Sequence, residues 1–317
     1  MLAPEFLHYC AVGITVALGS IGTGIGQGIG AFSAINALSR QKSGRDNIFR
    51  AMVIGLAFVE SGIILALVIS LIMLFGGGIK ITMPIAIAEI GIALAIGVAA
   101  TAISIGSSFA VKSACTSMSV QPFFSQKILT LMLLSQSIIE APVVFAFIIS
   151  LIIRTNFSPT LTIFEGVKLL AAGLCITLGC LGPCIGQGIF ANSSCRAAGL
   201  NKNAYNKIFT FSIINQAVIE TPLIFCLLIS VFIIFLPVPI LNPFTSTINF
   251  LVAGITIGMG ALGTSTSAGL VASKSCYQIA LEPENYSILF RTTILAQAFI
   301  ESNAIYALLI AIFLAIR

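Results

Sequence analysis

Long apolar runs alternate with short polar breaks along the whole chain. Four runs of 25 or more residues that are almost free of charge lie at 51–75, 128–153, 208–235 and 292–316. Four equally long stretches, richer in Gly, Ala and Ser, lie at about 6–38, 84–118, 163–198 and 246–280. Roughly 20 apolar residues cross the hydrocarbon of a bilayer as an α-helix. The pattern therefore predicts eight membrane-spanning helices.

Composition agrees with a chain that has the bilayer as its solvent. Apolar residues make up 58% and charged residues only 8% of the 317 residues, whereas about a quarter of a soluble domain is charged. The first apolar stretch has no basic leader or cleavage motif, so we expect it to remain in the mature protein. The eight cysteines show no spacing typical of a metal site or a disulfide framework, and we predict no bound metal.

The apolar runs repeat as pairs. Glu60, Glu140, Glu220 and Glu301 are separated by 80, 80 and 81 residues, and each lies in the second helix of a pair. The first helices align at the same offsets, most clearly 22–28 with 182–188 and more loosely with 102–108 and 263–269. Small residues at these positions let membrane helices approach closely. We predict an all-α membrane fold of four tandem hairpins, with boundaries at 1–79, 80–158, 159–241 and 242–317.

The four glutamates are the candidates for chemistry. A charged side chain at the bilayer centre costs about 2.5 to 3.5 kcal/mol on insertion scales, so such residues are usually functional. Burial disfavours the ionised form, and each glutamate is therefore expected to take up a proton or cation before it faces lipid. The alternative is a structural, hydrogen-bonded glutamate, which does not explain four copies at constant depth.

Carboxamides accompany the glutamates by two routes. Gln136, Gln216 and Gln297 lie four residues before their glutamates, one turn away on the same helix face. Gln27 and Gln187 lie on the first helices of the first and third pairs. Every pair thus has at least one carboxamide, which we expect to bind the carboxyl group of that pair. In the alternative interpretation, some of these glutamines serve only to hold helices together.

Basic residues gather around the turn that joins the two helices of each pair. Eleven of the fifteen Lys and Arg residues lie around these turns: Arg40, Lys42, Arg45, Arg50, Lys112, Lys127, Arg196, Lys202, Lys207, Lys274 and Arg291. Short loops rich in Lys and Arg remain in the cytoplasm. The tips are therefore expected to face the cytoplasm, with both termini and the connectors at 76–83, 154–162 and 236–246 on the opposite side. The positive charge indicates topology, and we predict no nucleic-acid partner.

Three features of the first pair occur together in a known family. They are the Gly-rich first helix ending in Gln27, the tip Arg40-Gln41-Lys42, and the segment Ile54 to Glu60 followed by a long aliphatic run. This hairpin resembles the c subunit of rotary ATP synthases, the F-type proteolipid. The resemblance recurs clearly in the third hairpin and reaches the second and fourth mainly through glutamate, small residues and length. Family members usually have one hairpin, or two in the vacuolar type.

The resemblance implies a proton-carrying rotor and no catalysis by this chain. The hairpins would form a homo-oligomeric ring with the glutamates on its outer helices, and a stator a subunit would supply an arginine and two half-channels. Arg40, Gln41 and Lys42 would contact the central stalk, and ATP chemistry would take place in partner subunits. The expected location is a bacterial inner membrane, with the lipid bilayer as a further partner and no cofactor.

The same family indicates which ion is carried. Sodium-carrying members surround the cation with a first-helix Gln, the Glu, a following Ser or Thr, and a Tyr five residues after the Glu. The candidate supporting hydroxyls here are Ser61, Thr221 and Ser302, but Leu65 and Phe225 stand at two of the Tyr positions. The fourth hairpin has Tyr306 but Ala268 in place of the Gln. Because an incompletely coordinated sodium ion stays poorly solvated, we expect H⁺ to be carried rather than Na⁺.

Two other classes remain open from the sequence. A secondary transporter or channel with parallel repeats also uses midplane carboxylates, but it needs a pocket of varied polar groups, and the spans offer little beyond Glu, Gln and Ser. A structural or assembly protein of the membrane is the third possibility. His8, the sole histidine, is expected at the membrane interface.

Overall fold

The computed structural model describes residues 3–76, 80–239 and 241–317. The helices are α1 (Pro4–Arg40), α2 (Arg45–Phe75), α3 (Met83–Val120), α4 (Ser125–Ile139), α5 (Ala141–Thr155), α6 (Ile163–Leu200), α7 (Tyr205–Phe235), α8 (Pro243–Leu281) and α9 (Tyr286–Ile316). Short 3₁₀ turns precede α4, α7 and α9 at Pro122–Phe124, Lys202–Ala204 and Pro283–Asn285. Residues 77–79 and 240, in the connectors expected at 76–83 and 236–246, lie outside the described residues.

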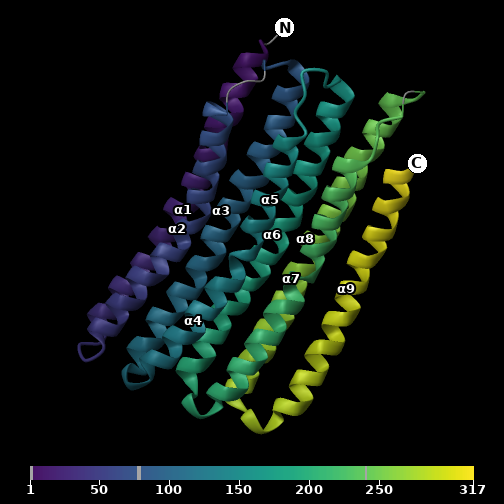
Figure 1. Ribbon diagram of the computed structural model, residues 1–317. Helices are drawn as coiled ribbons and strands as arrows, with labels where there is room; N and C mark the ends of the chain where they lie inside the picture. The colour runs from purple at the N-terminus through teal and green to yellow at the C-terminus, as the bar shows by residue number, and fades with distance from the viewer. Residues whose placement is uncertain (1–2, 77–79, 240) are drawn as a thin grey trace.

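Eight spans can be counted in the described part of the chain, with α4 and α5 taken together as one. Each is long and apolar enough to cross a membrane, which confirms the predicted all-α membrane fold. Both chain ends lie at one end of the bundle, and the four turns that join the helices of each hairpin lie at the other (Figure 1). We call these four turns the tips.

The helices form two layers because the two helices of each hairpin differ in side-chain size. The first helices α1, α3, α6 and α8 pack directly against one another in that order, and we call them the inner layer. The second helices α2, α4 with α5, α7 and α9 cover one side of it and form the outer layer. The inner layer thus supplies most of the contacts between hairpins.

Glycines set the close spacing of the inner helices. A Cβ atom added at Gly188 of α6 would lie 2.8 Å from the Cα atom of Gly106 of α3, and one added at Gly182 would lie 2.7 Å from the Cα atom of Leu262 in α8. Real Cβ atoms do not approach backbone so closely, so a larger residue would push the helices apart. Close approach is the main source of attraction between helices in lipid, and these glycines therefore hold the layer together.

The second outer helix is interrupted at its glutamate. Helix α4 ends at Ile139 and α5 begins at Ala141, so Glu140 lies at the break. Pro142 has no N–H to donate and cannot continue the hydrogen-bond ladder. Pro222, the corresponding residue of the third hairpin, lies inside the continuous helix α7. The four outer helices therefore present their glutamates on backbones that are not identical.

A lysine from the inner layer caps the C-terminal end of α7, which lies at the end of the bundle opposite the tips. Lys168 of α6 is buried, and its Nζ donates to the carbonyl oxygens of Ile234 at 3.0 Å and Leu236 at 2.9 Å. These carbonyls lie at the end of a helix, where partners within the helix are missing. The amine satisfies them and fixes α7 against α6.

Candidate ion-carrying site

The four glutamates occupy corresponding positions in the outer layer. Glu60 lies on α2, Glu140 at the α4–α5 break, Glu220 on α7 and Glu301 on α9. Glu60 is exposed in the single chain, and the other three are partly buried. The Ser104 hydroxyl of α3 donates to the Val59 carbonyl at 2.8 Å, so the inner layer directly backs the helix turn that carries Glu60.

One glutamate is bound from the neighbouring hairpin. The Ser61 hydroxyl of the first hairpin donates to Oε1 of Glu140 in the second hairpin at 3.0 Å. The sequence groups Ser61 with Glu60, its neighbour in the chain, and the structure instead directs it to the next hairpin. Thr221 and Ser302 donate within their own helices, to the carbonyls of Ala217 and Phe299.

Gln27 approaches the glutamate of its own hairpin. Its Nε2 lies 3.5 Å from Oε2 of Glu60, at the outer limit of a hydrogen bond. The contact joins the Gly-rich helix α1 to α2. It gives Glu60 a donor on the inner side while its outer side remains open.

The other predicted carboxamides use their amide groups between helices. Gln136 Nε2 donates to the Gly55 carbonyl at 3.0 Å and to the Ser107 hydroxyl at 2.8 Å. The remaining bonds of this kind run from Gln187 to the Gln216 carbonyl (3.2 Å), from Gln216 to the Ser135 hydroxyl (3.0 Å) and from Gln297 to the Ala268 carbonyl (3.3 Å). The amides of Gln136, Gln216 and Gln297 thus bind groups on other helices, as in the alternative interpretation in which glutamines hold helices together. Gln187 also lies within hydrogen-bond reach of the Glu220 carboxyl group.

The same four glutamines leave one acceptor each. Their Oε1 atoms are buried and accept no hydrogen bond within the described residues, and the same is true of Oε1 of Glu301. A buried acceptor without a donor is costly, and it fits a site that receives a proton. A role for these oxygens in ion binding stays a prediction.

The tip residues lie at the far end of the same hairpin. Arg40 ends α1, and Gln41 and Lys42 form the turn before α2. Arg40 and Lys42 are exposed, whereas Gln41 is partly buried. The two basic side chains are accessible to a partner at the tip.

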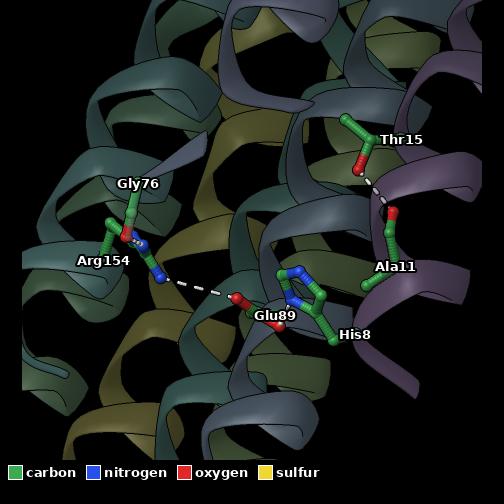
Figure 2. A network of polar contacts seen from close by, with 6 residues as sticks. All are labelled: His8, Ala11, Thr15, Gly76, Glu89 and Arg154. Carbon is green, nitrogen blue, oxygen red and sulfur yellow. Dashed lines mark hydrogen bonds and ion pairs between the residues drawn. The ribbon is translucent and has the colours of Figure 1, made fainter. Parts of the chain in front are cut away.

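A second polar cluster lies at the opposite end, between the first two hairpins (Figure 2). Glu89 of α3 is fully buried, and its Oε2 lies 2.6 Å from Nδ1 of His8 on α1. Its Oε1 lies 3.5 Å from one terminal guanidinium nitrogen of Arg154 on α5, and the other terminal nitrogen donates to the Gly76 carbonyl at 2.7 Å. We call these three side chains the His8–Glu89–Arg154 cluster.

The sequence interpretation missed the partners of this cluster. His8 is only 5% exposed and is paired with Glu89, while its position at the membrane interface stays a prediction. The available signal was a carboxylate inside an apolar stretch, at Glu89, with a basic residue near the same end of the hairpin. Only the packing of α1 on α3 shows which side chains meet.

Comparison with known proteins matches all four hairpins to one family. The model of the ATP synthase C subunit matches residues 10–73, 90–153, 170–233 and 251–314. Individual ATP synthase c subunits are similar to one hairpin length of this chain. That of Citrifermentans bemidjiense is 47% identical over 78 residues, which are 24% of this chain and 86% of the relative. That of Dehalococcoides mccartyi is 45% identical over 71 residues, or 22% and 93%.

Proposed function

Because the chain belongs to the family of the ATP synthase C subunit, we propose that its four hairpins form an arc of a rotor ring and carry protons on Glu60, Glu140, Glu220 and Glu301. The observation that carries the proposal is the row of four carboxyl groups at corresponding positions of the outer layer. The chain is a multi-pass membrane protein without a catalytic role of its own. Nucleotide chemistry would belong to partner subunits.

The proton cycle follows from the cost of a charge in lipid. A glutamate that faces hydrocarbon is expected to be protonated, and one that meets a water-filled path or the stator arginine ionises. Rotation then moves a neutral carboxyl through lipid. The membrane potential contributes about 2.3 kcal/mol per charge and 100 mV, which is the work available at each site.

Protons are favoured over sodium by the donors and acceptors around the carboxyl groups. Glu60 has the weak Gln27 contact and Glu140 has Ser61, whereas sodium needs several oxygen ligands at short range. A proton requires only the carboxyl group and one acceptor. Glutamine oxygens without a partner among the described residues lie on α4, α7 and α9, the helices of the later three glutamates, and on α6 at Gln187.

A second copy of the chain fits the two free sides of the inner layer. Gly28 on α1 and Gly263 on α8 have no neighbouring atom of the described residues within 4 Å. The corresponding glycines of α6 are both packed, Gly188 against the preceding inner helix α3 and Gly182 against the following one, α8. We propose that α8 of one copy packs on α1 of the next. Ser302 would then donate a hydrogen bond to Glu60 of the next copy, just as Ser61 donates to Glu140 within the chain.

The orientation and the other partners follow from the same proposal. The basic tips would face the cytoplasm of a bacterial inner membrane, where Arg40, Gln41 and Lys42 contact the central stalk. A stator a subunit would provide the arginine that each glutamate meets. Family membership favours this rotor over a repeat-built transporter or a purely structural protein.

Replacement of the glutamates tests the function. Inverted membrane vesicles carrying all four changes Glu60→Gln, Glu140→Gln, Glu220→Gln and Glu301→Gln should make no ATP from a proton gradient. The matched control is Glu284→Gln, which removes an exposed carboxylate at the fourth tip and should leave synthesis unchanged. ATP synthesis that persists in the fourfold variant would refute the proposal.

Labelling by a carbodiimide at fixed pH tests the ion. The reagent modifies protonated carboxyl groups, and a bound sodium ion would protect them. We expect labelling of the four glutamates to be the same with sodium as with an equal concentration of potassium or choline. Protection by sodium alone would contradict proton transport while leaving the rotor assignment intact.

A further inference from the structure

The fourth tip carries two acidic side chains. Glu282 directly follows α8, and Glu284 lies in the short turn before α9. Both are exposed. The ion pairs found in the described parts of the chain all involve Glu89, so neither acid is paired with a cation there. The second and third tips contain no acid at 120–127 or 200–207.

The position of Glu282 is one that a following hairpin covers. The residues that end the inner helix of the earlier hairpins in the same way are Gln41, Gln121 and Asn201. All three are partly buried, and each has a hairpin after it, whereas Glu282 has none and is exposed. Asn201 shows the contact, since its Nδ2 donates to the Ala280 carbonyl of the next hairpin at 2.9 Å. Glu282 therefore lies where a next hairpin would pack.

Each junction between hairpins within the chain brings the same residue of the later tip against the earlier tip. The residues at this position are Pro122, Lys202 and Pro283. A Cβ atom added at Gly44 of the first tip would lie 3.1 Å from the Cβ atom of Pro122. Lys202 lines a cavity of 420 Å³ together with residues 120–124 of the second tip. The Pro283 carbonyl accepts a hydrogen bond from Nζ of Lys207 at 2.8 Å.

The corresponding residue of the first tip is Lys42. In the proposed ring this tip lies beside the fourth tip of the preceding copy, and the spacing of the glutamates matches Gly44 to Asn285 and Pro122 to Lys42. The contact of Gly44 with Pro122 thus becomes a contact of Asn285 with Lys42 of the next copy. Nδ2 of Asn285 donates to Oε2 of Glu282 at 2.6 Å. The carboxylate is therefore held at the place where Lys42 would arrive.

We propose that Glu282 of one copy forms an ion pair with Lys42 of the next, so that the acidic fourth tip recognises the basic first tip of a second copy of this chain. Arg40 and Arg45 are also exposed beside Lys42, against the single acid Asp46. Opposite charges steer association and fix register, and like charges oppose it. The inference rests on the proposed ring.

Only the junction between separate molecules needs such recognition. The three junctions inside the chain are held together covalently, and the residues in the place of Glu282 are neutral there. An exposed ion pair is weak by itself. The packing of α8 on α1 therefore supplies the main attraction between copies, and the charged pair selects which tips meet.

Glu284 provides a matched control on the same tip. Its counterpart in the second tip is Phe123, which is fully exposed although that tip has a hairpin on both sides. A position that two neighbouring hairpins leave uncovered does not lie at a junction. A charge change at Glu284 therefore alters the tip without altering the proposed contact.

Charge reversal tests the pair. Purified chains assemble in detergent without the stalk, to which Lys42 is also assigned, and native gels give the protein concentration at which half of the chains are in rings. Glu282→Lys should weaken association roughly fivefold at each junction, because attraction becomes repulsion, and Lys42→Glu should do the same. The double variant Glu282→Lys/Lys42→Glu should recover the wild-type value. These differences should shrink in 1 M salt, where the screening length is about 3 Å.

Two controls separate the pair from a general effect of charge. Glu284→Lys should leave association unchanged, and Arg50→Glu, on the exposed side of α2, should not rescue Glu282→Lys. Equal weakening by Glu284→Lys would overturn the proposal, as would a double variant Glu282→Lys/Lys42→Glu that is no better than its single parents.

Cross-linking of the wild-type ring decides if the variants do not fold. A water-soluble carbodiimide joins a carboxylate to an amine that touches it, without a spacer. We expect peptides that link Glu282 to Lys42 of another chain, and a ring without this link refutes the pair. Rings that form but ignore the charge reversal contradict only the tip contact. Wild-type protein that forms no ring contradicts the rotor and the tip contact with it.

Discussion

The His8–Glu89–Arg154 cluster should couple the first two hairpins energetically. Glu89 is fully buried and meets two basic groups from α1 and α5, while Arg154 also reaches the Gly76 carbonyl at the end of the first hairpin. Replacing Glu89 by Gln keeps the shape and removes the charge. The bond to His8 is short, and charge-assisted bonds are worth about 1.5 to 3 kcal/mol, so we expect Glu89→Gln to lower the free energy of unfolding by about 2 kcal/mol.

Arg154→Met should cost more than its 3.5 Å ion pair suggests. It leaves a buried carboxylate with one partner, and breaking a buried pair from one side costs about 3 to 5 kcal/mol. The 17% exposure of the arginine side chain and the remaining His8 contact place the expected loss near the lower limit. The double variant Glu89→Gln/Arg154→Met removes the buried charge as well, so its loss should be smaller than the sum of the single losses.

The buried thiols provide the assay. Seven of the eight free cysteines are buried, so a thiol-reactive dye reports unfolding in detergent as SDS is added. The control Arg291→Met removes an exposed arginine and should change stability by less than about 0.5 kcal/mol. Losses from Glu89→Gln and Arg154→Met that add within about 0.5 kcal/mol would refute the coupling.

Three further predictions concern single contacts. Ser61→Ala removes the hydroxyl of the first hairpin that donates a hydrogen bond to Glu140 of the second. The rate of carbodiimide labelling of Glu140 should therefore change, while that of Glu220 should not. An unchanged rate at Glu140 would contradict the contact. Gly28→Val should leave the single chain folded but prevent ring assembly on native gels, because Gly28 has no neighbour within the chain. Gly188→Val should prevent folding, because Gly188 is packed on Gly106 of α3. Equal behaviour of the two variants would count against the α8–α1 junction. Lys168→Met should lower the free energy of unfolding by about 2 kcal/mol, since two carbonyls at the end of α7 lose a charged donor, and a neutral result in the SDS titration would show that water replaces the amine.

The repeat made the fold predictable, and the side-chain partners were less so. Apolar length and the spacing of the glutamates were sufficient for the hairpins, because a span must satisfy its backbone internally. The direction of Ser61 was not predictable, since it depends on how neighbouring hairpins are rotated. The sequence predicts that Gln136 binds Glu140, but its side-chain Nε2 donates hydrogen bonds to the Gly55 carbonyl and the Ser107 hydroxyl. Helix periodicity places residues on a face, whereas a hydrogen bond also depends on the helix opposite.

Fusion of four hairpins gives each glutamate its own surroundings. Glu60 meets a carboxamide from its own hairpin, and Glu140 meets a hydroxyl from the preceding one at a helix break. In a ring of separate identical hairpins every site must be the same, whereas one chain fixes the order of unequal sites. A ring built only from this chain would contain hairpins in multiples of four, and the free energy of loading and releasing a proton would repeat with that period. In the proposed rotor the constant position of the carboxyl groups would keep the proton path the same for all four sites, while the different contacts around them would make the steps energetically unequal.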